Sequence, residues 1–233
     1  LELAMRALKI KQEVLGENNR STELTIFRIG NIYDLQGSID KAEFFYQKSL
    51  VINRKLLQSR EFNTYIDIDR SLRAVADIYR KKGQYIKSEE LIKEGLSFVK
   101  QAVGENHKFS ANSHHELARL YSTQGLNKKA IDQYKIALNI KEKELGEIHP
   151  DLVILLNGLA NLYSKTGLYK ESQLLQERSL NIAKNSLNNH HPDFGTLHNN
   201  IANTYLRQGL FDEAAFHNEL SSRIALNYIQ REA

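Results

Sequence analysis

Histidine is the residue type in this chain best suited to holding a metal ion. Four of the eight histidines stand in adjacent pairs, His114–His115 and His190–His191. Metal ligands must converge on one point, whereas neighbouring residues on a helix point in different directions. His107, His149 and His191 also recur 42 residues apart. We interpret the histidines as helix-capping and surface residues, and we predict no metal site.

Residue sets for catalysis are also missing from the sequence. It contains no glycine-rich phosphate loop, no HExxH and no CxxC, and a serine–histidine–acid set can be assembled only by arbitrary choice. We therefore predict that the chain is not an enzyme and takes no cofactor. Any catalytic activity is expected to lie outside this sequence.

The composition is that of an ordinary soluble protein, with 41% hydrophobic and 26% charged residues. The absence of cysteine excludes disulfides and thiolate zinc sites and favours a reducing compartment, so we expect a cytoplasmic protein. The longest apolar run, residues 152–156, is far shorter than a membrane span. The first residues resemble the middle of a helix, which suggests part of a longer protein. A net charge of +4 is too small to indicate a nucleic-acid binder.

A tyrosine followed four residues later by a glycine occurs five times. The glycines are 46, 42, 42 and 42 residues apart. A period of this length indicates a solenoid, in which each repeat packs on its neighbours. The pairs are Tyr33 and Gly37, Tyr79 and Gly83, Tyr121 and Gly125, Tyr163 and Gly167, and Tyr205 and Gly209.

Small residues stand seven before and five after each glycine, for example Ala118 and Ala130. Two antiparallel helices approach closely only where side chains are small. The glycine is expected to end the first helix, helix A, in a left-handed conformation before helix B. In the fourth repeat we place helix A at 151–165 and helix B at 170–185. The same pattern makes residues 1–18 helix B of an incomplete repeat.

The segments between repeats carry helix-start signals. Pro150 and Pro192 suit the first helical turn, and Asp151 and Asp193 follow them beside the positive helix start. Four extra residues fall within 56–71, between the first and second repeats. The sequence leaves open whether they lengthen a helix or form a loop.

These motifs closely resemble the tetratricopeptide repeat, in the 42-residue form typified by kinesin light chain and also found in bacterial multidomain proteins. The phrases LGEIHPDLVILLNGLANLY and HHPDFGTLHNNIANTYLRQG carry the likeness. The resemblance implies an all-α fold, a right-handed α-solenoid of antiparallel helix pairs with about 11 helices. It implies one array over 1–233, with complete repeats at 20–60, 61–106, 107–148, 149–190 and 191–233.

In such arrays the A helices line a concave groove, and the resemblance places ligand contacts thirteen, ten, six, three and two residues before each turn glycine. The groove residues that we select on this basis are Arg70, Arg73, Asp77, Arg80, His115, Arg119, Asn157, Asn161, Lys165, Asn199, Asn203 and Arg207. The same positions also include Phe27, Asp34, Lys81, Ile154 and Thr196.

The groove positions hold seven basic residues and two acidic ones, a net charge of +5. Low-dielectric walls would focus this field on an acidic ligand, and guanidinium groups can grip a carboxylate with two hydrogen bonds. The asparagines could pair with the backbone of an extended peptide, because a carboxamide both donates and accepts.

We therefore predict a protein–protein interaction scaffold that binds an acidic peptide or partner segment. An alternative is a regulatory array that controls a CHAT-type protease or NB-ARC-type ATPase domain elsewhere in a full-length bacterial protein. Binding of nucleic-acid phosphates is a weaker alternative, since Phe27 is the only groove aromatic available for base stacking.

Overall fold

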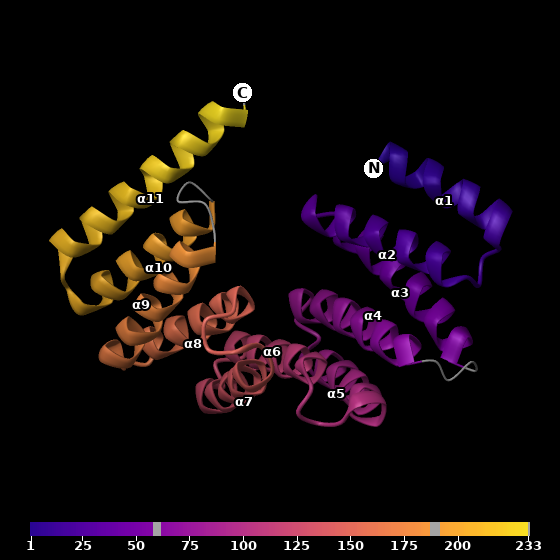
Figure 1. Cartoon of the computed structure of the whole chain (residues 1–233), viewed down its shortest axis with the longest axis horizontal. Coiled ribbons are helices and arrows are strands. Elements are labelled where there is room, and N and C mark those ends of the chain that lie inside the picture. The colour runs from indigo at the N-terminus through magenta and orange to yellow at the C-terminus, as the bar shows by residue number, and fades with distance from the viewer. Residues whose placement is uncertain (58–61, 187–191, 233) are drawn as a thin grey trace. The chain divides into compact units, whose positions relative to one another are not determined.

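The computed structural model describes residues 1–57, 62–186 and 192–232, and the prediction of an all-α protein is confirmed. The described residues form eleven α-helices and one short 3-10 helix (Figure 1). They fall into two compact units, Leu1–Gln124 and Gly125–Ala233, which are described separately below as unit 1 and unit 2.

Each unit is a succession of helices that pack on their neighbours in sequence. Unit 1 contains α1 (Glu2–Leu15), α2 (Arg20–Leu35), α3 (Ile39–Leu56), α4 (Phe62–Lys81), α5 (Tyr85–Val103) and α6 (Lys108–Thr123). Unit 2 contains α7 (Asn127–Leu145), the 3-10 helix η2 (Pro150–Leu152), α8 (Val153–Lys165), α9 (Tyr169–Ser186), α10 (Pro192–Gln208) and α11 (Phe211–Glu232). The segment predicted as helical at 1–18 contains α1, which ends at Leu15, and the segment at 170–185 lies within α9. The segment predicted at 151–165 begins in the 3-10 helix η2 and continues as α8.

The turn glycines adopt the conformation that the sequence requires. All five have φ between +72° and +82°, the left-handed region in which a side chain is strained. In the first hairpin the backbone N–H of Ser38 donates to the carbonyl of Tyr33 at 2.9 Å, which closes the end of α2. Tyr33 is the tyrosine that stands four residues before the turn glycine, as in every repeat.

The small residues of the repeat meet where helix A packs on helix B. Ser88 Oγ on α5 donates to the carbonyl of Ala76 on α4 at 2.8 Å, and Ser172 on α9 makes the same 2.8 Å bond to Ala160 on α8. All four residues are fully buried. The two columns of small residues therefore form the close helix–helix contact predicted from the sequence.

Two of the recurring histidines cap helices, as their spacing indicated. His107 Nδ1 accepts a hydrogen bond from the backbone of Phe109 at 3.3 Å, before α6. His149 Nδ1 accepts from the backbone of Asp151 at 3.1 Å, before η2. His191, the third member of the series, lies outside the described residues.

The four extra residues of the second repeat lengthen its A helix. Helices α2, α6 and α10 begin 17 residues before their turn glycines, whereas α4 begins 21 residues before Gly83. The additional turn is the start of α4; residues 58–61, which precede it, lie outside the described residues. The open question about 56–71 is thus answered in favour of helix.

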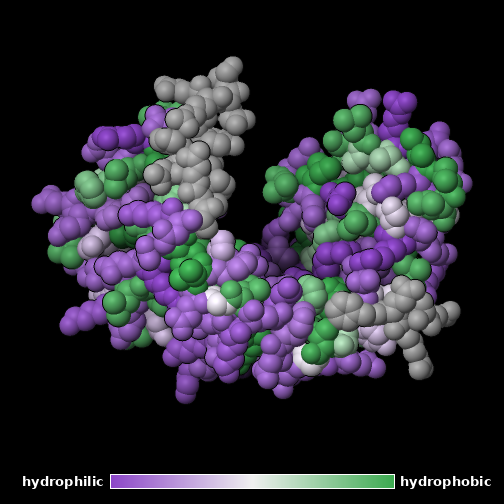
Figure 2. Space-filling model, viewed as in Figure 1, coloured by the Kyte–Doolittle hydropathy of each residue, from purple (hydrophilic) through white to green (hydrophobic). Residues whose placement is uncertain are grey.

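The core consists of aliphatic side chains between successive helices, such as Leu8, Ile26, Ile29 and Ile52 in unit 1. Hydrophilic side chains cover most of the visible face of each unit, with hydrophobic ones scattered among them (Figure 2). Within the part of the chain described, none of the helices combines the length and apolar character that crossing a bilayer requires.

Candidate functional site

The A helices of unit 1 bring six predicted groove positions to one pocket of about 170 Å³, here called the unit-1 pocket. Side chains of α2, α4 and α6 form most of its wall, and Tyr46 of α3 completes it. The lining residues are Phe27, Asp34, Tyr46, Arg70, Arg73, Ala74, Asp77, Glu116 and Arg119. Positions far apart in the sequence are therefore neighbours in the unit-1 pocket.

Arg70 joins α2 and α4 through a buried carboxylate. Its Nη2 lies 3.0 Å from Oε2 of Glu23, which is 0% exposed, and its Nη1 lies 2.7 Å from Oδ1 of Asp67. Ser49 and Asn53 on α3 also donate to Glu23, at 2.5 and 3.0 Å. Buried charges persist only when they are paired and hydrogen-bonded, so this cluster fixes three helices against one another.

Arg73 is anchored at one end only. Its Nε donates to Asp69 Oδ2 at 2.8 Å, and the other oxygen of Asp69 accepts a 2.7 Å hydrogen bond from Ser113 on α6. The two terminal nitrogens of Arg73 make no hydrogen bond with the described part of the chain, although the side chain lines the unit-1 pocket.

Asp77 is the centre of a second ion-pair network. Its carboxylate lies 2.6 Å from Arg80, 3.0 Å from Lys81 and 3.3 Å from Arg119, and Lys81 also contacts Asp34 at 2.6 Å. Burial alone would raise the pKa of Asp77, but hydrogen bonds from Arg80 and Lys81 and the charge of Arg119 hold that pKa below its usual range. The network links α2, α4 and α6.

Four acidic residues of these networks were missed by the sequence analysis. They occupy positions just outside the groove columns, and each pairs with a groove arginine: Glu23, Asp67, Asp69 and Glu116. Three of them stand three or four residues before their arginine on the same helix, a spacing that puts side chains side by side. That spacing could have identified them, and their charges offset the predicted cationic surplus of unit 1.

The predicted groove residues of unit 2 have few partners. Asn161, Asn199 and Asn203 are exposed, and so are Lys165 and Arg207 at the ends of α8 and α10. Asn203 Nδ2 donates to Asn199 Oδ1 at 2.9 Å, which joins two of the predicted asparagines. His115, the remaining predicted residue, is half-buried on α6 in unit 1.

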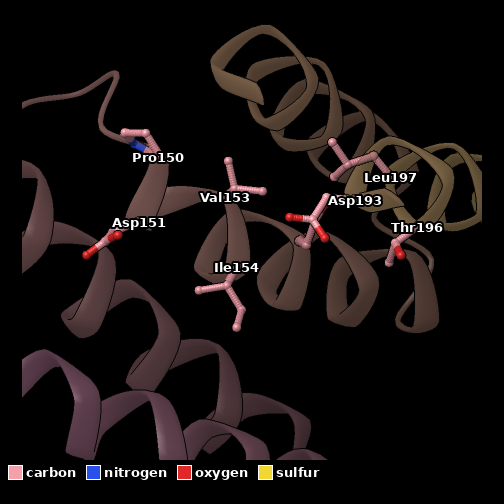
Figure 3. A pocket seen from close by; sticks show the side chains of 8 residues that line it. Pro150, Asp151, Val153, Ile154, Asp193, Thr196 and Leu197 are labelled. Carbon is pink, nitrogen blue, oxygen red and sulfur yellow. The ribbon is translucent and has the colours of Figure 1, made fainter. Parts of the chain in front are cut away.

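Unit 2 has a larger pocket of about 410 Å³ at the starts of two neighbouring A helices, here called the unit-2 pocket (Figure 3). Its lining residues are Pro150, Asp151, Val153, Ile154, Asn157, Asp193, Thr196 and Leu197. Asn157, Ile154 and Thr196 are predicted groove positions. The side-chain oxygen of Asn157 is buried and has no hydrogen-bond partner in the part of the chain that the structure describes.

Two histidines face each other between α10 and α11. The Nδ1 atoms of His198 and His217 are 3.0 Å apart, and the ring of Tyr205 stacks on His217. Burial lowers the pKa of both imidazoles, and the positive charges of His217 and Lys184 lower that of His198 further. Both imidazoles therefore resist protonation more than an ordinary histidine does.

Metal-binding side chains do not gather into a larger group. Among the described residues, no three or more His, Asp or Glu side chains are placed to hold one metal ion. The polar groups of both pockets are suited to hydrogen bonding and ion pairing with a ligand.

Comparison with known proteins identifies the repeats. A family model described as tetratricopeptide repeat matches residues 67–143 and 151–227, and a second model of the same description matches residues 25–56. A search of curated protein sequences gives no significant match.

Solved structures share the fold at low sequence identity. BtubC (BKLC) from P. vanneervenii is 19% identical with a TM-score of 0.77, and the match covers 97% of this chain and 90% of that one. A putative kinesin light chain repeat protein from Podosopora anserina is 23% identical with a TM-score of 0.65, covering 88% and 95%. A Rap protein in complex with competence and sporulation factor is 14% identical with a TM-score of 0.64, covering 90% and 65%.

These identities are low enough that the structures support the fold alone, whereas the family models match most of the sequence directly. The family models identify the same repeat that the tyrosine–glycine turns and the small residues between paired helices indicate. The chain belongs to the tetratricopeptide repeat family.

Proposed function

We propose that the chain is a protein–protein interaction scaffold, and that its A-helix faces hold a peptide or a segment of a partner protein. The observation that carries this proposal is the unit-1 pocket, where six positions assigned to ligand contact line one cavity. A Rap protein of similar fold was solved with competence and sporulation factor bound, which supports ligand binding by such an array.

The acidic character of the partner is also a proposal, and it now depends on Arg73 rather than on net charge. The unit-1 pocket is lined by three arginines and three carboxylates, so its formal charge is balanced. Arg73, however, uses only Nε for Asp69 and leaves two terminal nitrogens for a ligand. A carboxylate can accept two parallel hydrogen bonds from this end of the guanidinium group.

The asparagines of unit 2 supply a second mode of recognition. Asn161 on α8 and Asn199 and Asn203 on α10 are exposed, and each carboxamide can both donate and accept. An extended segment could therefore bond to them through its backbone, with no requirement for a particular side chain. Binding of nucleic-acid phosphates is less favoured, because it needs several cations in a row, whereas Arg70 and Arg119 already bond carboxylates of the chain.

Regulation of other domains in a longer chain and a cytoplasmic location stay predictions from the sequence. Both concern the context of the array rather than its A-helix faces, so they do not alter the proposed contacts. The binding experiment below addresses the array itself.

The test is a pull-down with quantitative mass spectrometry that compares the wild-type chain with matched variants. Arg73→Lys keeps a charge beside Asp69 but loses the planar fork, and Asn203→Ala removes an exposed carboxamide. The control is Leu174→Ala, an exposed residue on the B helix α9. We expect partners to be lost from the first two variants and retained by the control. Unchanged partners in both groove variants would refute the proposal.

A further inference from the structure

We infer that the unit-1 pocket binds one isolated acidic side chain of the partner, an aspartate or glutamate whose neighbours in the partner sequence are uncharged or basic. This inference rests on the proposed function and narrows it, because an acidic segment can carry either one carboxylate or a run of them. The number of carboxylates that the pocket tolerates follows from its size and from the pairing of its charges.

The pocket has room for one side chain rather than for a longer stretch of a partner. Its volume of about 170 Å³ is below the range of roughly 300–1,000 Å³ typical of pockets that hold a whole ligand. Phe27, Tyr46 and Ala74 supply apolar surface, and the rings of Phe27 and Tyr46 are 5.3 Å apart. These groups can contact the methylene groups of an acidic side chain whose carboxylate reaches Arg73.

Arg73 is held in place and keeps bonding capacity for a ligand. Its side chain is 19% exposed, and the 2.8 Å bond from its Nε to Asp69 fixes the guanidinium group at one end. Asp69 is itself held by the hydroxyl of Ser113, so Arg73 is positioned before a ligand arrives. The two terminal nitrogens of Arg73 make no hydrogen bond with the described part of the chain, and together they can donate to one carboxylate.

The other two arginines of the pocket lining are paired within the chain. Arg119 contacts Glu116 at 2.8 Å and Asp77 at 3.3 Å. Arg70 contacts Glu23 at 3.0 Å. Glu116 and Asp77 also line the pocket, so a second acidic side chain of the partner would meet negative charge there. Repulsion between like charges therefore selects against a run of acidic residues.

The experiment titrates the full chain with short peptides and follows its alanine methyl groups by NMR. The probe is N-acetyl-alanyl-glutamyl-alanine amide, which carries a single acid. It is compared with the same peptide containing glutamine in place of glutamate, and with N-acetyl-triglutamate amide.

We expect the single-acid probe to shift the methyl signal of Ala74 saturably, while Ala215, exposed on α11 in unit 2, should not shift. The glutamine probe should bind about tenfold more weakly or worse, the range for the loss of a charged hydrogen bond. The triglutamate probe should bind about two- to fivefold more weakly, since repulsion of its additional acids outweighs its choice of three carboxylates. A generally cationic groove would instead bind triglutamate most tightly.

Two matched variants test the part played by Arg73. Arg73→Lys keeps a charge beside Asp69 but has a single nitrogen, so most of the preference for glutamate over glutamine should be lost. Arg80→Lys makes the same exchange at a groove arginine that bonds Asp77 and does not line the pocket. This variant should leave the preference intact.

A third variant, Glu116→Gln, removes one carboxylate from the pocket lining and should reduce the disadvantage of the triglutamate probe. Four results would each overturn the inference: no saturable shift of Ala74, triglutamate binding at least as tight as that of the single acid, equal effects of Arg73→Lys and Arg80→Lys, or an unchanged disadvantage in Glu116→Gln. If Arg73→Lys loses partners in the pull-down while any of these results is found, the inference is wrong and the proposed function stands.

Discussion

The A-helix faces of the two units use polar residues in opposite ways. In unit 1 the arginines of α4 and α6 bond carboxylates of α2, α4 and α6, several of them buried. In unit 2 the corresponding positions include the three exposed asparagines Asn161, Asn199 and Asn203. The unit-2 pocket also contains the side-chain oxygen of Asn157, which has no hydrogen-bond partner among the described residues.

Residues at the same repeat position can therefore either stabilise the array or stay available to a ligand. Ion pairs between successive A helices of unit 1 hold those helices in register, and they use much of the bonding capacity of the arginines. The exposed side chains of unit 2 contribute little to helix packing and retain that capacity. We therefore expect substitutions of the paired acidic residues of unit 1, such as Glu23, to change mainly stability. Substitutions of the exposed asparagines of unit 2, and of Arg73 in unit 1, should change mainly binding.

The largest effect is expected from Glu23→Ala in unit 1. It removes a fully buried carboxylate and should lower the free energy of unfolding by about 3 kcal/mol, the low end for a broken buried pair, because Arg70 keeps Asp67. Urea denaturation measures this change. Glu94→Ala, which breaks the exposed Arg54–Glu94 pair, is the control and should cost less than about 1 kcal/mol. Equal costs would mean that the buried network does not hold unit 1 together.

An intermediate effect is expected where the two units are alike. Ala76 of α4 and Ala160 of α8 occupy the same repeat position and are both fully buried. Replacement of either by leucine should overpack the helix contact at a cost of about 1–3 kcal/mol. Hydrogen exchange can locate the loss in unit 1 or unit 2 respectively, because each repeat depends on its neighbours. A much smaller loss of unfolding free energy in one unit would show that the two units differ in helix packing as well as in their polar faces.

The smallest effect is a difference in acid sensitivity. The pKa values of His198 and His217 are lowered from the ordinary value of 6.5, because the folded chain favours their neutral forms. Their contribution to the stability of unit 2 is therefore complete above pH 6.5 and is lost as the pH falls below it. The pKa of Asp77 is lowered from 3.8, so its contribution to unit 1 is lost only below that pH.

Hydrogen-exchange protection measured at pH 7.5 and 5.5 should therefore fall at α10 and α11 and stay constant at α4. His217→Phe keeps an aromatic ring against Tyr205 without a titrating group and should reduce the fall. Equal losses in the two units, or an undiminished loss in the variant, would contradict the assignment.

The fold could be predicted almost entirely from the sequence, because it depends on local and periodic signals. The turn glycines, the small residues such as Ala76 and Ser88, and the capping histidines His107 and His149 each act within one repeat. Their spacing was sufficient to place the helices and their contacts.

The electrostatics of the site could not be read from the groove columns alone. Glu23 and Asp69 lie outside those columns, yet they bond Arg70 and Arg73, because a long side chain reaches a neighbouring turn or helix. The count of groove charges therefore overestimated the positive field of unit 1. The unit-2 pocket depends on how the starts of α8 and α10 lie together, which a column count does not describe.

Site-specific photo-cross-linking in cells tests the central claim, that the A-helix faces are the binding surface, most directly. A photoreactive phenylalanine analogue would replace Asn161 or Asn203 on A helices, or Leu174 on the B helix α9 as an equally exposed comparison. We expect the same partner bands from both A-helix positions and none from Leu174. Cross-links from Leu174 alone, or equally from all three positions, would contradict it.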